Sequence, residues 1–355
     1  IGQWQAGGKY KDVPGPRGRG IVKRPGWGDY RAYGSTPVPP ELKERPWEAH
    51  SDWNILAPAL RKLPELAASN QPWCLYVGHN GPHDPFVMPE PYAKMYDPGK
   101  IALPPSYRDT LADKPRIYQR MRKQYWDQLT EEEVRESIAH YWGYCSLEDD
   151  YLGLLLQALD ATGQAGDTLV IFTSDHGDYC GAHGLYCKGV PAFREAYHVP
   201  CVLRWPQGIQ HAGRTVDEFV SLADFAPTFA DLGGAAALGE TTGRSLAPFL
   251  RGETPADWPQ EVHAQFNGVE LYYSQRSVTT KRFKYVYNGF DFDELYDLQK
   301  DPHEMVNLAD DPACAEVKRD LCRRVWRFAA REQDHMLFNG YATVAMAPWG
   351  PADAL

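Results

Sequence analysis

Several features are missing from this sequence. No apolar run reaches the roughly 18 residues that a membrane-spanning helix needs. There is no long Lys/Arg block, and the single basic cluster, at residues 17–24, stands in a chain whose formal net charge is -10. An acidic chain without a basic arm is a poor binder of nucleic acid. The sequence therefore predicts no membrane span and no nucleic-acid partner, and an anionic ligand would need a local positive site.

The cysteines also lack a recognisable framework. There are seven of them, an odd number, and most stand inside apolar runs. This pattern predicts buried free thiols, not a disulfide scaffold or a zinc site. No signal peptide is visible, and the chain opens on Ile1, so the sequence leaves open a cytoplasmic and a periplasmic or secreted location. Assembly into a homo-oligomer is left open as well.

The sequence contains enough hydrophobic residues to form a large core. The chain has 355 residues, 43% of them hydrophobic and 13% aromatic, which suits one large domain and a smaller one. We predict an incomplete α/β domain over residues 1–255 and an α+β subdomain over residues 256–335. Residues 336–355 are expected to form a tail.

The hydrophobic periodicity predicts the fold class. Helical patterns cover residues 51–68 and 131–162, and short apolar runs typical of buried strands cover residues 73–78, 168–173 and 199–205. A long helix that leads into such a strand indicates α/β architecture with a mostly parallel central sheet and helices on both faces. After about residue 255 the pattern alternates, which predicts paired antiparallel strands at residues 278–280 and 283–287. Residues 294–298 precede a polar turn, and a helix is expected over residues 313–333.

Polar clusters follow two of the predicted strands. Residues 79–84 come after the first strand, and residues 175–178 come after the second. Ligands of open α/β sheets bind just beyond the carboxyl ends of strands, so this placement predicts an active site. Asp175 and His176 could there converge on one divalent ion. Lys188 stands 13 positions after Asp175 and could bring an ammonium back to a tetrahedral oxyanion.

Plainer interpretations exist for each of these residues. An Asp-His pair at the end of a strand often caps a loop beside a half-buried imidazole. A lysine such as Lys188, taken alone, is most often a surface residue. The joint spacing of the three residues favours the functional interpretation.

Residues 174–189 (SDHGDYCGAHGLYCKG) resemble the sulfatase pattern of S-D-H-G-D, G-x-H-G-L and K-G after an apolar strand. The G-P-H-x-P pattern of that family is matched at residues 81–85, and its S-x-x-D-D pattern at residues 146–150. Its carboxyl-terminal patterns are matched at residues 284–288, 294–298 and 301–308. The sequence is identified as a member of the sulfatase family, within the alkaline phosphatase superfamily, over nearly all of residues 50–330.

The resemblance implies roles for particular residues. Asp175 and His176 would be ligands of one divalent metal ion, with calcium expected first and manganese or magnesium open. Lys188 would contact the sulfate and the leaving oxygen. His83 would lie near the scissile ester, as a hydrogen-bond donor or as the general acid to the leaving alcohol. His79, His183 and Asp178 are further candidates, and for Asp178 a simple turn-capping role stays open.

The sequence departs from the family at the nucleophile. Sulfatases carry an amino-terminal C-x-P-S-R or S-x-P-S-R segment, whose Cys or Ser becomes formylglycine. No cysteine here is followed by x-Pro-x-Arg, so the chain offers no nucleophile. Residues 2–7 resemble the family's G-K-W-H-x-G, with Gln3 and Gln5 where a sulfate-binding Lys and a His are usual. Both are substrate-binding candidates, although glutamine adds no positive charge.

The expected function is therefore a metal-dependent sulfuric ester hydrolase that acts on a sulfated small molecule or sugar. A phosphonate monoester hydrolase or phosphodiesterase of the same superfamily is the first alternative. The second, motivated by the absent nucleophile, is a non-catalytic sulfatase-like binding protein.

Overall fold

The computed structural model describes residues 16–24, 26, 28–69, 71–236, 238–268, 274–289 and 291–334. Its chain divides into two compact units, each built from separate stretches of sequence. The first unit draws on residues 1–108, 120–168 and 178–187, and the second on residues 109–119, 169–177 and 188–355. Gln3, Gln5 and the predicted tail at residues 336–355 lie outside the described residues.

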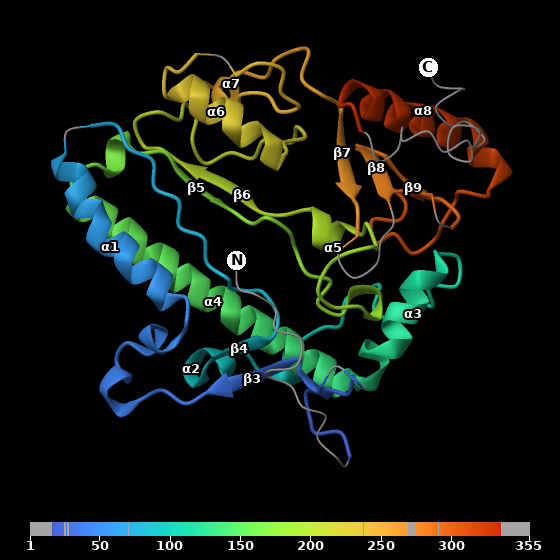
Figure 1. The fold of residues 1–355 in the computed structure, drawn as a ribbon, viewed down its shortest axis with the longest axis horizontal. Helices are drawn as coiled ribbons and strands as arrows, with labels where there is room; N and C mark the ends of the chain where they lie inside the picture. Colours follow the sequence, from blue (N-terminus) through green and yellow to red (C-terminus); the bar gives the residue numbers. More distant parts are fainter. Residues whose placement is uncertain are drawn as a thin grey trace. The chain divides into compact units, whose positions relative to one another are not determined.

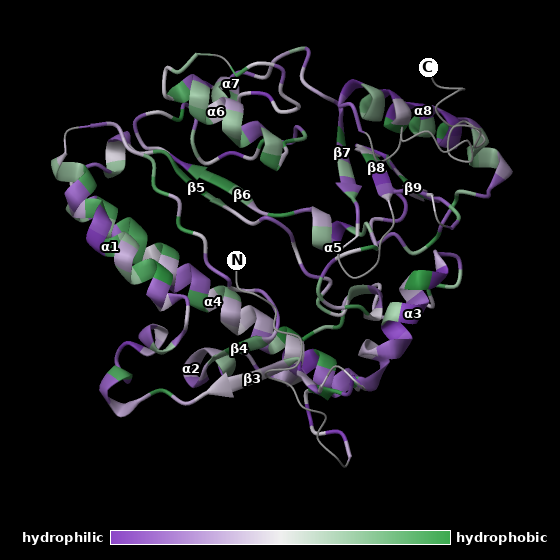
Figure 2. Cartoon of the chain, in the orientation of Figure 1, coloured by the Kyte–Doolittle hydropathy of each residue, from purple (hydrophilic) through white to green (hydrophobic). Residues whose placement is uncertain are grey.

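The first unit is built around one long helix. α4 (Glu131–Ala161) begins with a capping box, in which Thr130 and Glu133 bond to each other's backbone N–H groups. α1 (Trp53–Ala68) packs along α4, as Figure 1 shows. Both helices carry hydrophilic and hydrophobic residues along their length (Figure 2), which is typical of helices with one buried face.

Short elements complete the first unit. β3 (Tyr33–Thr36) runs parallel to β4 (Phe86–Pro89), and both pack on α4. Leu147 and Tyr151 of α4, Leu56 of α1 and Met88 of β4 have no exposed surface and mark the core. The remaining elements are β1 (Ile21–Val22), which is antiparallel to β2 (Tyr30–Arg31), and α2 (Glu90–Ala93). Short 3-10 turns lie at Pro40–Leu42, Pro46–Ala49, Pro98–Lys100, Trp126–Gln128, Ala165–Asp167 and Ala182–Gly184.

The second unit contains a four-stranded antiparallel sheet, in the order β10-β9-β8-β7. Its strands are β7 (Glu261–Phe266), β8 (Gln275–Thr280), β9 (Phe283–Asn288) and β10 (Glu294–Asp297). α8 (Ala315–Arg331) packs on β8 and β9 (Figure 1), and Trp326 of α8 is buried against Val278, Tyr285 and Leu295 of the sheet.

The rest of the second unit surrounds a separate strand pair. β5 (Val170–Thr173) pairs with β6 (Cys201–Arg204) in antiparallel register. The remaining helices are α5 (Arg194–Tyr197), α6 (Phe225–Leu232) and α7 (Ala247–Leu250), with 3-10 turns at Leu222–Asp224 and Pro312–Cys314. α3 (Arg116–Gln124) contributes residues to both units.

The predicted α/β class and the carboxyl-terminal antiparallel strands are confirmed. The helices predicted at residues 51–68 and 131–162 also form, within a few residues of the expected bounds. Among the described residues, no helix is both long enough and apolar enough to cross a membrane.

Three local expectations differ from the structure. Residues 73–78 form no strand, because no described segment pairs with them and a strand exists only with a hydrogen-bonded partner. β5 is not buried on both faces, because Phe172 is 38% exposed. Its partner β6 is largely hydrophobic in Figure 2, yet Val202 of β6 is 59% exposed. Of the seven free cysteines, Cys74 and Cys145 are exposed and Cys322 is buried.

Candidate active site

The turn after β5 is held by a serine hydroxyl and by a close backbone contact with the segment at residues 195–196. The hydroxyl of Ser174 donates to the carbonyl oxygen of His176 at 2.7 Å, and the N–H of Gly177 donates to the carbonyl oxygen of Ala196 at 2.9 Å. A Cβ atom at position 177 would lie 1.9 Å from the carbonyl oxygen of Glu195. Glycine is therefore required for the chain to pass this close to its neighbour.

Asp175 and His176 present their side chains from this turn. Nδ1 of His176 lies 2.8 Å from the carbonyl oxygen of Gly177. A carbonyl oxygen only accepts, so Nδ1 carries the hydrogen, and Nε2 is the ring nitrogen on the side of the Asp175 carboxylate. That Nε2 atom lies 3.8 Å from Oδ2 of Asp175, whose side chain is 84% exposed.

This donor pair fits a divalent cation. One ion about 2.1–2.4 Å from each atom is compatible with their separation, and a carboxylate with a neutral imidazole suits calcium or manganese better than a soft metal. Within the described ranges, no third His, Cys, Asp or Glu side chain joins these two at ligand spacing. The pair therefore supplies part of a coordination shell.

His83 stands in the loop between α1 and β4, within the first unit. Its Nδ1 lies 2.6 Å from the carbonyl oxygen of Asp84 and 3.2 Å from the Oδ1 atom of the same residue. Nδ1 must donate here, so Nε2 is the atom that can face a substrate. The backbone N–H of His83 donates to the carbonyl oxygen of Asn80, which closes a tight turn.

Two carboxylates from outside the loop hold it in place. Nδ1 of His79 lies 2.7 Å from Oε2 of Glu148, which belongs to α4. The N–H of Gly81 donates to Oδ2 of Asp52, just before α1, at 2.8 Å. The sequence analysis did not single out Glu148 or Asp52. The available signal was the position of Glu148 one helical turn after Tyr144, on the same face of a predicted helix.

A second metal-ligand group lies in the first unit. The ligand atoms of Asp84, Asp178 and Cys187 all lie within 4.8 Å of one another. Tyr30 donates its hydroxyl to Asp84, and burial, Cys187 and the nearby carboxylates raise the pKa of Tyr30. Oδ1 of Asp178 also accepts the N–H groups of Cys180 at 2.7 Å and Cys187 at 3.1 Å. Asp178 therefore closes the loop at residues 178–187, as its turn-capping interpretation requires.

His183 and Lys188 are the remaining predicted site residues in the described part of the chain. His183 is fully buried, and its backbone N–H donates to the hydroxyl of Ser106 at 3.2 Å. Its ring therefore lies in the interior of the first unit. Lys188 is half-buried and begins a stretch of the second unit.

The stretch that follows Lys188 is tied to the carboxyl-terminal sheet by a buried ion pair. Nζ of Lys284 lies 2.6 Å from Oε1 of Glu304 and also donates to the carbonyl oxygen of Ala192. Oε2 of Glu304 accepts the N–H of Arg194 at 2.8 Å. Residues 301–308 were recognised as a family pattern, but this anchoring role was not predicted.

Comparison with known proteins decides the family. The model of the family described as Sulfatase matches residues 4–235, and that of N-sulphoglucosamine sulphohydrolase, C-terminal, matches residues 181–331. The chain belongs to the sulfatase family.

Individual relatives agree with this assignment. The multifunctional alkaline phosphatase superfamily protein PehA of Trinickia caryophylli is 32% identical, over 73% of this chain and 56% of its own length. Choline-sulfatase of Rhizobium meliloti is 33% identical, over 72% and 50% of the two chains. The crystal structure of phosphonate monoester hydrolase of Agrobacterium radiobacter matches with a TM-score of 0.72 at 29% identity, over 82% of this chain and 63% of that one. The chain spans about half the length of the curated relatives it matches.

This sulfatase-family chain is thus similar to hydrolases over about half of their length. Two of the buried thiols in the described part are poor nucleophile candidates. Burial raises the pKa of Cys180 and of Cys322, which disfavours the reactive thiolate.

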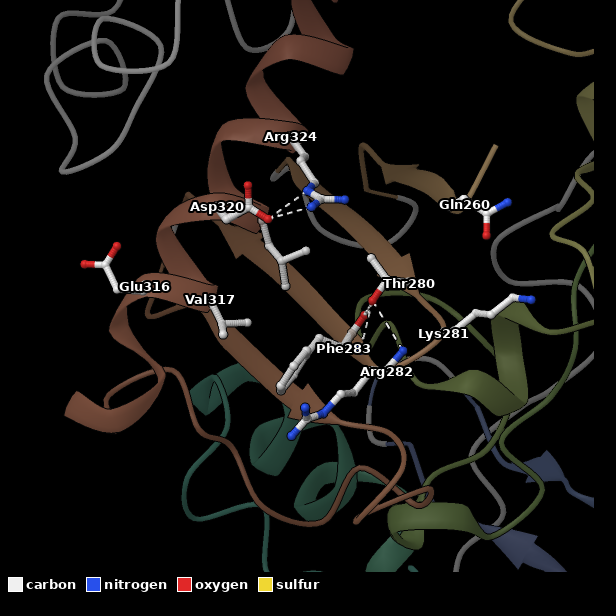
Figure 3. A pocket seen from close by; sticks show the side chains of 10 residues that line it. Gln260, Thr280, Lys281, Arg282, Phe283, Glu316, Val317, Asp320 and Arg324 are labelled. Carbon is white, nitrogen blue, oxygen red and sulfur yellow. Dashed lines mark hydrogen bonds and ion pairs between the residues drawn. The ribbon is translucent and has the colours of Figure 1, made fainter. Parts of the chain in front are cut away.

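A pocket of about 570 Å³ lies in the carboxyl-terminal part of this sulfatase-family chain, between α8 and the turn that joins β8 to β9 (Figure 3). None of the predicted site residues lines it. Its guanidinium groups are already paired: Arg282 lies 3.0 Å from Asp297, and Arg324 lies 2.7 Å from Asp320 and from Glu261. The pocket thus offers little uncompensated charge to a ligand.

Proposed function

We propose that this chain forms the metal-binding and sulfate-binding part of a sulfuric ester hydrolase that acts on a sulfated small molecule or sugar. The observation that carries the proposal is the placement of the His176 ring beside the Asp175 carboxylate. Nδ1 of His176 donates to the carbonyl oxygen of Gly177, which turns Nε2 toward Oδ2 of Asp175 at 3.8 Å. Outer hydrogen bonds of this kind orient histidine ligands of metals.

In this proposal Asp175 and His176 hold one divalent ion, with calcium the first candidate and manganese or magnesium the next. When bound, such an ion stabilises negative charge on the transferred group. Lys188 contacts the sulfate and the leaving oxygen through its ammonium group. Gln3 and Gln5 donate hydrogen bonds to the substrate.

His83 assists the departure of the alcohol. Since Nδ1 is fixed on the carbonyl oxygen of Asp84, a protonated ring donates from Nε2 to the leaving oxygen. The Asp84 carboxylate lies 3.2 Å from Nδ1, on the side of the ring away from Nε2. The nucleophile is not a residue of this chain. We further propose that residues 1–255 and 256–335 act as the catalytic domain and its carboxyl-terminal subdomain.

A calcium titration of the purified chain by calorimetry tests the metal site. Asp175→Asn should weaken binding by at least about tenfold, the usual size of a lost ligand's effect on affinity. Asp167→Asn, an exposed aspartate just before β5, is the matched control and should bind calcium as the wild type does. Equal affinity in all three proteins would refute the metal site.

The phosphonate monoester hydrolase match makes a second activity worth testing, because that enzyme is 29% identical to this chain over 63% of its own length, with a TM-score of 0.72. Initial rates of the complete hydrolase, in which the nucleophile is present, should be higher with an aryl sulfate than with an aryl phosphonate monoester. Faster phosphonate hydrolysis would favour the phosphonate activity. Binding of the sulfate without turnover of either ester would favour a non-catalytic binding protein.

A further inference from the structure

The loop that carries His83 is supported from one side by a single face of α4. Tyr144, Glu148 and Tyr151 recur at a spacing of four and then three residues, so they line one face of the helix. The ring of Tyr151 meets the ring of His79 edge-on, with centroids 5.1 Å apart. The Glu148 carboxylate lies between these two tyrosines along the helix.

Glu148 contacts the loop with both of its oxygens. Oε2 accepts the hydrogen of His79 Nδ1 at 2.7 Å. Oε1 is buried, makes no hydrogen bond, and lies 2.1 Å from where a Cβ atom of Gly81 would stand. Only a glycine lets the loop come this close, and that contact fixes the backbone two residues before His83.

The buried surroundings make this contact strong. The side chains of His79 and Glu148 are 13% and 10% exposed. A charge-assisted hydrogen bond in such a place is worth about 1.5–3 kcal/mol, more than a neutral or solvated one. Asp52 adds a second fixed point through the N–H of Gly81. Residues 79 and 81 are therefore held from outside the loop, and His83 follows them in a tight turn.

We propose that Glu148, acting through His79 and against Gly81, is a positioning residue that sets the orientation of the His83 imidazole. This role rests on the proposed function of His83 in alcohol departure. Glu148 itself need not touch the substrate. It fixes where Nε2 of His83 points, and a displacement of about 1 Å in such a group can lower a rate by about a hundredfold.

The test uses variants of the whole chain that separate hydrogen bonding from shape. Glu148→Leu removes both contacts, whereas Glu148→Gln keeps an oxygen that accepts from His79. His79→Phe keeps an aromatic ring against Tyr151 but removes the Nδ1 hydrogen that His79 donates to Glu148. This variant replaces Glu148→Leu in the test if Glu148→Leu fails to fold. Glu136→Leu is the matched control, because Glu136 lies on the same helix but bonds to Arg19 and Tyr33, away from the loop.

The first readout is structural and does not depend on turnover. In Glu148→Leu and His79→Phe, the N–H of Gly81 should exchange with solvent at least about tenfold faster, and the ring nitrogen signals of His83 should shift. Glu148→Gln and Glu136→Leu should retain the wild-type exchange rate and ring signals. Unchanged His83 signals in Glu148→Leu, or an equal change in Glu136→Leu, would overturn the proposal.

The second readout is kinetic. In the complete hydrolase, where the nucleophile is present, Glu148→Leu should lower kcat for an aryl sulfate by about 10- to 100-fold with little change in KM, and Glu148→Gln should recover most of the loss. A normal kcat despite a disordered loop would refute positioning. A complete wild-type hydrolase without turnover would count against the proposed function alone, and the His83 ring signals would then decide the structural role of Glu148.

Discussion

The two polar segments that carry the candidate site residues are stabilised in different ways. The turn at residues 174–178 is held by backbone groups, through Gly177 and Ala196. The loop at residues 79–85 is held by the side chains of Glu148 and Asp52, which come from other elements. Both segments are rich in polar groups, yet one depends on close approach of main chains and the other on two carboxylates.

This difference decides what each segment tolerates. A backbone-held turn survives truncation of many neighbouring side chains but not the addition of a Cβ atom where main chains touch. A loop held by side chains responds to single deletions, because each deletion removes one hydrogen bond and leaves a buried partner unsatisfied. Substitutions should therefore separate the two segments.

The largest effect on stability is expected from a buried ion pair that anchors the backbone beside the turn at residues 174–178. The backbone stretch next to Gly177 is anchored by the buried pair of Lys284 and Glu304, whose side chains are 6% and 0% exposed. Lys284→Met leaves the Glu304 carboxylate buried without its cation. We expect a loss of about 3–5 kcal/mol in the free energy of unfolding, measured by urea denaturation.

A neighbouring pair provides the control for this prediction. Arg282 bonds to Asp297 at 3.0 Å but is 50% exposed, so Arg282→Met should cost no more than about 1 kcal/mol. Adding Glu304→Gln to Lys284→Met should restore part of the lost stability, because the uncompensated charge is then gone. Equal losses for Lys284→Met and Arg282→Met would show that the ion pair is not the anchor.

The second largest effect concerns acid and belongs to the first unit. Burial opposes ionisation of Glu133, but hydrogen bonds from Arg17 and from the N–H groups of Thr130 and Gly20 outweigh it and lower the pKa of Glu133 to about 2. A carboxyl whose pKa is depressed by folding stabilises the protein above its unfolded pKa. That stability, about 3 kcal/mol, is lost as the pH falls from about 4.5 to about 2.

Acid denaturation followed by circular dichroism checks this prediction. Glu133→Gln should be less stable at neutral pH and should lose less further stability between pH 4.5 and 2 than the wild type does, because its amide does not titrate there. Glu132→Gln is the matched control, since the Glu132 side chain is 80% exposed. An acid profile of Glu133→Gln that parallels the wild type would assign the acid sensitivity to other carboxyls.

The parts of the fold that could be predicted are those encoded by local pattern. The helix at residues 131–162 was predicted from its helical apolar pattern, and it forms at Glu131–Ala161. The alternating residues near 278–287 form adjacent antiparallel strands, because a short turn brings them together without help from distant segments. Local signals of this kind are fixed by the chain itself.

Strand pairing was harder to predict than the helices, because a strand pairs with segments that are distant in the sequence. The apolar run at residues 73–78 has the composition of a strand, but among the described residues no other segment pairs with it. β5 and β6 are antiparallel, although the connection over residues 174–200 is long enough for a parallel crossover, so its length does not decide the pairing. Apolar composition alone does not specify either outcome.

The candidate site shows the same limit. Asp175 and His176 lie together because they are adjacent in sequence, and their spacing was readable. The role of Glu148 could not be predicted, because its partner His79 lies 69 positions earlier in the chain. In the sequence alone, a glutamate on a helix cannot be distinguished from a solvent-exposed one. Pairs that are distant in sequence can be recognised only once the packing is known.

The smallest effect tests the backbone-held turn directly. Gly177→Ala places a Cβ atom 1.9 Å from the carbonyl oxygen of Glu195, so the main chains must separate. We expect a loss of about 1–3 kcal/mol by urea denaturation, and weaker calcium binding because Asp175 and His176 move with the turn. Exchange of the Gly81 N–H, in the side-chain-held loop, should stay at the wild-type rate.

Gly153→Ala is the matched control for this last variant. Gly153 lies within α4, and a Cβ atom there meets nothing within 4 Å. The substitution should raise stability by up to about 1 kcal/mol, because alanine is the better helix former. If Gly177→Ala were as stable as Gly153→Ala and bound calcium normally, close backbone approach would not be what shapes the turn, and the contrast with the loop at residues 79–85 would fail.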